Sequence, residues 1–157
     1  YIYMMNFASK KYLPYVLLII PNIAVYLPTI LYPVEQNVGN EVLFRPPGYV
    51  FAIVWPILLT LLGISWFVRR KLGLYLNFVY ILLVLLLAIW FILYDTSKLY
   101  GLIDIIVCFV IVLYLILYNY KNIDKYGTFT LVPLLLWLSF ASSLNILDIM
   151  VEILEKK

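Results

Sequence analysis

Charged residues are scarce in this sequence, since they make up 12% of its 157 residues, whereas a soluble domain carries roughly 25%. Hydrophobic residues reach 66%. Too few polar side chains remain to cover a surface in water, so the apolar surplus must face lipid. We therefore predict one integral membrane domain over residues 1–157, and we exclude a soluble domain.

Histidine is absent, and Cys108 is the single cysteine. The chain thus lacks the commonest general base, zinc ligand and haem axial ligand. One cysteine forms neither a disulfide framework nor a cysteine metal site. We expect no metal site and no required cofactor, and a haem would bind by stacking and burial. The net charge of +3 comes from residues at segment ends and indicates membrane topology, not nucleic-acid binding.

Five apolar stretches are long enough to cross a bilayer, because about 20 helical residues span roughly 30 Å of hydrocarbon. They are residues 12–32, 49–68, 74–94, 99–118 and 128–151. The pattern predicts an all-α, multi-pass bundle of five transmembrane helices. Tyrosines at the stretch ends are typical of an interfacial belt, at positions 12, 32, 49, 94, 118 and 126.

Basic residues indicate the orientation, because they are retained on the cytoplasmic face. Seven lie on the amino-terminal side: Lys10, Lys11, Arg69, Arg70, Lys71, Lys121 and Lys125. Four lie on the other side: Arg45, Lys98, Lys156 and Lys157. We expect the amino terminus on the cytoplasmic side; an outer mitochondrial membrane and another cellular membrane both stay open.

The first stretch contains Pro14, Pro21 and Pro28 at seven-residue spacing, which predicts a bent helix. It is too long for a signal peptide and has no small-residue cleavage site, so we interpret it as a retained helix. The longest connection, residues 33–48, ends in two prolines and Gly48. We expect this rigid segment to cap one mouth of the bundle.

Two helix faces are candidates for a ligand site. Residues at helical spacing form an aromatic stripe on the second helix: Phe51, Trp55, Leu58, Leu62 and Trp66. Plain packing or lipid contact also explains such a stripe. One face of the fifth helix carries Trp137, Ala141, Leu144 and Asp148. Small residues beside that tryptophan permit close helix approach or leave room for a ligand, and hydrogen bonds between helices are expected from Ser139, Ser142, Ser143 and Asn145.

Acidic residues inside the stretches are functional candidates by default. Asp104 lies near enough to the interface to be solvated or to cap a neighbouring group. No Lys or Arg within a stretch is available to pair with Asp104 or Asp148, so we expect no proton relay. No nucleophile and base can be combined into a catalytic set. Any chemistry would belong to a bound ligand and to oxidisable side chains such as Trp55, Trp90 and Trp137.

Two signatures resemble one family. Residues 45–55, RPPGYVFAIVW, and residues 131–145, LVPLLLWLSFASSLN, resemble the loop, second-helix and fifth-helix signatures of the translocator protein family, also called tryptophan-rich sensory proteins or peripheral benzodiazepine receptors. Leu31-Tyr32-Pro33 and Leu102-Ile103-Asp104 fit the same pattern at matching separations. The resemblance covers nearly the whole chain.

This resemblance implies a five-helix bundle whose first loop closes a cavity for porphyrins, sterol-like lipids or benzodiazepine-like drugs. It places Trp55 and Trp137 in the cavity wall, Ala141 and Leu144 below Trp137, and Pro46 above. Phe51 and Trp90 complete the predicted ligand-binding set. It also implies dimerisation through helix faces.

Several positions depart from the family pattern. Phe44 and Tyr49 replace two usual tryptophans, and Leu85 and Ala88 replace the usual Asn and Trp of the third helix, with Trp90 half a turn on. We therefore expect the lid and the third-helix contacts to differ. The sterol motif is not kept after Leu144, so cholesterol recognition is not predicted.

The function expected from these residues is a membrane receptor or binding protein for a flat hydrophobic ligand, a tetrapyrrole above all, with a role in its transport or in stress signalling. The first alternative is a light-dependent porphyrin-degrading enzyme that uses Trp55 and Trp137. The second is a passive membrane interaction subunit with a filled interior.

Overall fold

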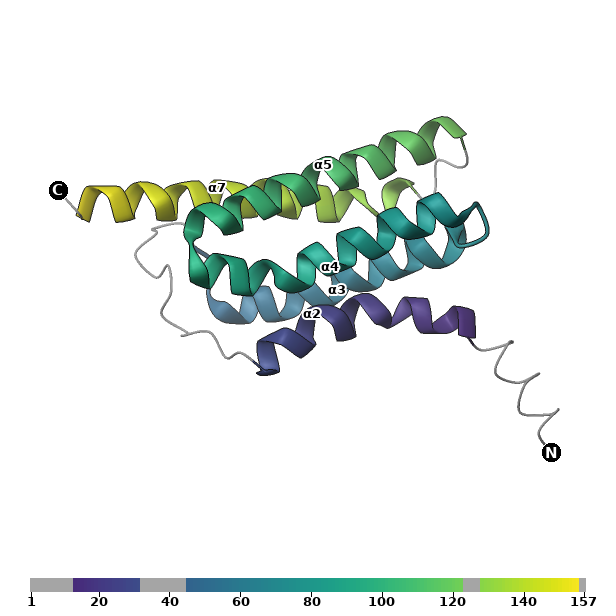
Figure 1. Cartoon of the computed structure of the whole chain (residues 1–157), viewed down its shortest axis with the longest axis horizontal. Coiled ribbons are helices and arrows are strands. Elements are labelled where there is room, and N and C mark those ends of the chain that lie inside the picture. The colour runs from purple at the N-terminus through teal and green to yellow at the C-terminus, as the bar shows by residue number, and fades with distance from the viewer. Residues whose placement is uncertain (1–12, 32–44, 123–127, 156–157) are drawn as a thin grey trace.

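A computed structural model describes residues 13–31, 45–122 and 128–155 of the chain, and within them it contains helices and no strands (Figure 1). The 3-10 helix η1 spans Leu13–Leu18. The α-helices are α2 (Ile20–Leu31), α3 (Gly48–Arg69), α4 (Leu74–Thr96), α5 (Lys98–Asn122) and α7 (Val132–Glu155). Of the predicted connection over residues 33–48, residues 33–44 lie outside the described residues, and so do Tyr12, Tyr32 and Tyr126.

The five α-helices run along the long axis (Figure 1). Their mutual contacts join them into a ring. Helix α2 packs against α3 and α4, α4 packs against α5, and α5 packs against α7. A contact between α7 and α3 closes the ring. We call the end where α3 begins and α7 ends the Pro46 end, and the end where α3 and α5 end the Arg69 end (Figure 1).

Four helices, α3, α4, α5 and α7, are long and apolar enough to cross a membrane. The fifth predicted span is shorter, because the stretch expected as one helix is divided into η1 and the twelve residues of α2. Twelve residues rise about 18 Å, which is less than the hydrocarbon thickness.

Pro21 explains the division of the first stretch. It has no N–H to donate to the carbonyl of Leu17, and its ring crowds that carbonyl. The chain instead makes a tighter bond from the Ile19 N–H to the Val16 carbonyl at 3.0 Å, and α-helical bonding resumes from Ile23 to Ile19 at 3.1 Å. The expected bend is therefore a change of helix type.

Two other boundaries differ from the sequence prediction. Helix α7 begins at Val132 and not at residue 128, because Pro133 suits the first turn of a helix, where an N–H has no partner. Helix α5 continues to Asn122 instead of ending at residue 118. Asn119, which was expected in a connection, is thereby buried inside the bundle.

The ring interior is filled by aliphatic side chains. Those with no exposed surface are Leu59, Leu62, Leu83, Val112, Leu115, Leu131, Leu134 and Leu138. Helix η1 packs close to α3 at Gly63, where a Cβ atom would lie 2.7 Å from the Leu18 carbonyl oxygen. A larger residue at this position would push the first stretch away from the bundle.

Candidate functional site

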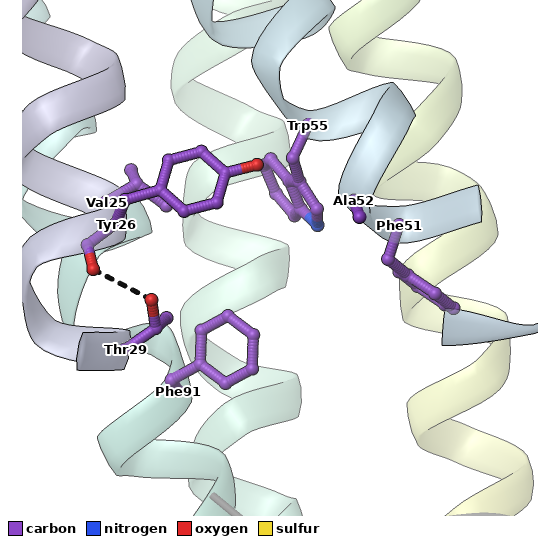
Figure 2. A pocket seen from close by; sticks show the side chains of 7 residues that line it. All are labelled: Val25, Tyr26, Thr29, Phe51, Ala52, Trp55 and Phe91. Carbon is purple, nitrogen blue, oxygen red and sulfur yellow. Dashed lines mark hydrogen bonds between the residues drawn. The ribbon is translucent and has the colours of Figure 1, made fainter. Parts of the chain in front are cut away.

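A cavity of about 190 Å³ lies between α2, α3 and α4. Figure 2 shows its lining: Val25, Tyr26, Thr29, Phe51, Ala52, Trp55 and Phe91. Two of the predicted ligand-binding residues, Phe51 and Trp55, are among them. Because Ala52 is exposed, the cavity opens to the lipid-facing surface of the bundle at this residue.

The cavity is mostly aromatic and apolar, with few polar groups. Thr29 donates its hydroxyl to the Tyr26 carbonyl at 2.7 Å, so this hydroxyl is already used within α2. The Tyr26 ring reaches from α2 towards Trp55 (Figure 2). Apolar walls with a small number of polar groups are typical of sites that bind small hydrophobic molecules.

Trp137 of α7 contacts the cavity wall from the other side of α3. Its ring lies edge-on to Trp55 at 6.5 Å and to Phe51 at 5.5 Å between ring centroids. Edge-to-face contact is a favoured arrangement of aromatic rings. It leaves no room for a flat ligand between Trp55 and Trp137, so the open space lies on the α2 side of Trp55.

The other predicted site residues lie around this aromatic cluster and do not line the cavity. Ala141 and Leu144 are buried on the same inward face of α7 as Trp137. Trp90 stacks on Tyr94 at 5.3 Å, and its neighbour Phe91 faces the cavity instead. Pro46 is half-buried at the Pro46 end, beyond the cavity.

The lower part of the second-helix stripe belongs to the bundle core. Leu58, Leu62 and Trp66 are buried, whereas Phe51 and Trp55 are half-buried. The stripe thus points inward along all of α3, and its upper two residues combine packing with the cavity wall. Among the alternatives given for this stripe, lipid contact does not apply to its lower part.

Three polar side chains from distant parts of the chain meet at the Pro46 end. Arg45 lies 3.3 Å from Asp148 and 3.5 Å from the Tyr94 hydroxyl, and Tyr94 donates a hydrogen bond to the same Asp148 oxygen. We call these three residues the Arg45 cluster. The sequence prediction concerned only basic partners within the membrane stretches, whereas the partner of Asp148 comes from the segment before α3.

The Arg45 cluster attaches the entry of α3 to α4 and α7. The Asp148 side chain is only 2% exposed, so its charge depends on these two donors. Gly101 brings the start of α5 against Tyr94, since a Cβ atom there would lie 2.9 Å from the Tyr94 Cβ. Tyr94 is therefore a buried cluster residue, and its predicted place in an interfacial belt is wrong.

The serines of α7 do not connect helices. Ser139, Ser142 and Ser143 donate to the carbonyls four residues earlier in their own helix, at 2.9, 2.8 and 3.1 Å. Hydroxyl groups in a helix commonly make this local bond, which satisfies them without a second helix. The expected hydrogen bonds between helices are therefore not made by these serines.

Asp104 is 4% exposed, so of its two expected roles, solvation at the interface does not apply. Its Oδ2 atom has no hydrogen-bond partner in the described part of the chain. No three metal-ligating side chains cluster within residues 13–31, 45–122 and 128–155.

Sequence reasoning missed the α2 side of the cavity and the Arg45 cluster. Tyr26 and Thr29 were detectable as polar residues in an otherwise apolar stretch, because their spacing of three residues places both side chains on one side of a helix. The pairing of Arg45 with Asp148 had a weaker signal: both charges lie at the same end of the predicted bundle.

Comparison with protein families assigns most of the chain to one family profile. A sequence profile described as the TspO/MBR family matches residues 36–148, which is well over half of the chain. The matched range includes both signatures, the Arg45 cluster and the cavity walls on α3 and α4. No curated protein sequence gives a significant match.

Proposed function

The chain belongs to the TspO/MBR family of membrane proteins, and from this premise we propose that it binds flat hydrophobic molecules, a tetrapyrrole above all, in the cavity beside Trp55. Family membership supports a ligand-binding or transport role in the membrane in general. The tetrapyrrole, its transport and a role in stress signalling are our proposal, with sterol-like lipids and benzodiazepine-like drugs as further candidates.

The aromatic cavity between α2, α3 and α4 is the observation that supports this proposal most directly. Trp55, Phe91 and Tyr26 offer ring surfaces that stack against a planar ligand. The opening at Ala52 faces the acyl chains, from which a hydrophobic ligand enters without crossing water. No histidine is needed, because stacking and burial hold the ligand.

The size of the cavity determines how such a ligand binds. About 190 Å³ is below the range of roughly 300–1,000 Å³ that encloses drug-sized molecules. A tetrapyrrole therefore inserts one edge beside Trp55 and extends past Ala52, or it moves α2 outward. Helix α2 is suited to such movement, since it is the shortest of the α-helices in the described residues.

A titration of the tryptophan fluorescence with protoporphyrin tests the proposal. We expect saturable quenching by the wild-type protein in nanodiscs and at least about tenfold weaker binding by Ala52→Phe, which fills the opening. Trp137→Ala should also lose binding, because it removes the ring that supports Trp55 and Phe51.

Ile53→Phe is the matched control, because Ile53 is the next residue of α3, is 59% exposed and does not line the cavity. It should bind protoporphyrin like the wild type. Equal affinity of the wild type and Ala52→Phe would contradict the proposal. Absence of saturable quenching in the wild type would favour a passive membrane subunit with a filled interior.

Light-dependent degradation of porphyrin is a second candidate function, and the contact between Trp55 and Trp137 favours it. The light-excited porphyrin would take one electron from Trp55 and become its radical anion, which passes the electron to dissolved oxygen. With centroids 6.5 Å apart, Trp137 can donate an electron to the Trp55 radical, so that the radical moves to Trp137. The test follows pigment absorbance under illumination. Equal decay with wild-type protein and with a Trp55→Phe, Trp137→Phe double variant would reject this candidate.

We also propose that η1 and α2 together form a fifth span. Six 3-10 residues at about 2 Å and twelve α-helical residues at about 1.5 Å rise about 30 Å in total, which matches the hydrocarbon thickness. The amino-terminal side would then face the cytoplasm, as the basic residues indicate. Dimerisation through a helix face stays a prediction.

Cysteine labelling tests the orientation. Lys71→Cys at the Arg69 end and Tyr49→Cys at the Pro46 end are both at exposed positions, whereas native Cys108 has no exposed surface. In sealed cells we expect a membrane-impermeant maleimide to label position 49 and to leave position 71 unlabelled. The reverse pattern would overturn the proposed orientation.

A further inference from the structure

Arg69, the last residue of α3, is buried at the end of the bundle opposite the Pro46 end. It is 1% exposed, and it is among the largest fully buried side chains of the described residues. Charged side chains are almost never fully buried without a partner, because removing a charge from water costs several kcal/mol. A charged side chain buried to this degree is expected to have a partner of opposite charge.

The guanidinium group of Arg69 is held on one side only. Its Nη1 donates to the Ser65 carbonyl at 3.2 Å and to the Ser65 hydroxyl at 3.0 Å. The Ser65 hydroxyl is in turn hydrogen-bonded to Tyr80 of α4 at 2.8 Å. The remaining nitrogens, Nε and Nη2, have no hydrogen-bond partner in the described part of the chain.

Nε and Nη2 together form one edge of the planar guanidinium group. Two parallel N–H groups on such an edge match two oxygens of a carboxylate or a phosphate, which is the geometry in which arginine binds oxyanions most strongly. Ser65 thus fixes the orientation of Arg69, while the edge that binds oxyanions is left without an acceptor.

The protein supplies no acidic partner for this edge from its described residues. Every aspartate and glutamate among them lies in the part of the bundle near the Pro46 end: Asp95, Asp104, Asp148, Glu152 and Glu155. The charged residues described at this end are basic instead: Arg70 and Lys71 follow Arg69, and Lys121 is in the last turn of α5. Helices α3 and α5 end at the same end of the bundle (Figure 1). Among the described residues, this end therefore carries basic side chains and no acidic ones.

Neighbouring groups hold the turn that carries Arg69 in place. Arg70 lies over the Phe67 ring, with its guanidinium carbon 3.8 Å from the centroid, and donates to the Phe67 carbonyl. Asn77 donates to the carbonyls of Arg70 and Gly73 at 2.8 and 2.9 Å. Arg70 is thus occupied by local contacts, which makes it a suitable control for Arg69.

We propose that Arg69 binds a phosphate oxyanion through its Nε and Nη2 atoms, and that the phosphate of an anionic phospholipid headgroup reaches it from the adjacent leaflet. The end of a membrane-spanning helix lies at headgroup depth, and basic groups between helices at this depth bind anionic lipids. Because Arg69 is 1% exposed, the side chains that shield it must move aside when the phosphate binds.

This site is separate from the ligand cavity. Arg69 follows Trp55 by fourteen residues of the same helix, which places it about 21 Å away along α3. The inference therefore stands without the proposed function, and the two are tested independently.

Native mass spectrometry of the full chain tests the proposal. The protein is extracted from nanodiscs of phosphatidylcholine mixed with phosphatidylglycerol, and the retained lipid is measured. We expect the wild type and Arg70→Gln to retain phosphatidylglycerol in preference to phosphatidylcholine. Arg69→Met should lose this preference, and Arg69→Lys, which keeps the charge without the paired N–H groups, should bind about tenfold more weakly.

Inorganic phosphate added to phosphatidylcholine nanodiscs distinguishes the two sources of the oxyanion. Retained phosphate that depends on Arg69, without a preference for phosphatidylglycerol, would assign the site to free phosphate and overturn the lipid assignment. Unchanged phosphatidylglycerol retention in Arg69→Lys overturns the proposal even if Arg69→Met fails to fold. Protoporphyrin quenching should be the same in Arg69→Lys and the wild type, which separates a lost oxyanion site from a damaged cavity.

Discussion

The two ends of the bundle differ in the partners of one arginine each, Arg45 and Arg69. Arg45 at the Pro46 end is 24% exposed and meets the carboxylate of Asp148 and the hydroxyl of Tyr94. Arg69 at the opposite end is 1% exposed and meets only Ser65 among the described residues. The more deeply buried charge is thus the one without a counter-charge.

This difference separates two uses of a buried cation. Arg45 pairs with Asp148 of α7 and Tyr94 of α4, and so it attaches the segment before α3 to both helices. Its role is therefore structural. Ser65, itself hydrogen-bonded to Tyr80, holds Arg69 in one orientation, and the Nε and Nη2 atoms have no acceptor in the described part of the chain. A group that binds an oxyanion needs such oriented, unused donors. Variants of the two arginines should therefore differ in their effect on stability.

Arg45→Gln should have the largest effect on stability. It leaves Asp148 buried with the Tyr94 hydroxyl alone, and removing one partner of a buried ion pair costs about 3 kcal/mol. Arg69→Met in phosphatidylcholine should not lower stability, because it removes a buried charge that has no partner there. The free energy of unfolding in detergent titrations measures both.

A double variant sharpens this first comparison. Arg45→Gln combined with Asp148→Asn should recover part of the loss, since no unpaired charge then remains at the Pro46 end. If Arg45→Gln and Arg69→Met lowered stability equally in phosphatidylcholine, the distinction between the two ends would be wrong.

Removing one hydroxyl at each end should have a smaller effect. Tyr94→Phe takes a donor from the charged Asp148 and should cost about 2 kcal/mol, whereas Tyr80→Phe breaks a bond between two neutral hydroxyls and should cost about 1 kcal/mol. The same unfolding titration checks the order. Tyr80→Phe should also weaken phosphatidylglycerol retention, because Ser65 then orients Arg69 less firmly, and Tyr94→Phe should leave that retention unchanged.

Ser143→Ala should have the smallest effect, about 0.5 kcal/mol or less, and it sets the lower limit for the comparison of the two ends. Ser143 is exposed and donates only to the Ser139 carbonyl of its own helix. A loss above 1 kcal/mol would mean that this hydroxyl bridges to another helix, contrary to the observed bond.

The sequence predicted the helical class, the four long spans and the aromatic residues Phe51 and Trp55 of the cavity wall. The helical class and the spans depend on local patterns, namely the length of an apolar run and the spacing of residues on one helix. The place of Trp55 in a cavity wall came from the family resemblance. The sequence did not predict the change of helix type before Pro21, although the proline was visible. A proline predicts a disturbance, but whether the helix kinks or becomes 3-10 depends on what packs beside it, here α3 at Gly63.

The α2 side of the cavity required the packed bundle. Val25, Tyr26 and Thr29 line the cavity with Trp55 because α2 packs against both α3 and α4. The pattern of a single stretch does not predict which helices become neighbours. The family signatures pointed to a site between Trp55 and Trp137, whereas in this structure those rings touch edge-on and the open space lies on the other side of Trp55.

The sequence by itself determined that this chain is a membrane protein, because a surface with so few charged residues is stable in lipid and not in water. It also determined which segments form the long helices. Only the tertiary structure decided which charges find partners. Arg45 and Asp148 are separated by 103 residues and meet because the ring closes, while Arg69 is buried by the same closure at an end where the described residues include no acid. Pairing of charges depends on distance in space, and a folded ring sets that distance independently of separation along the chain.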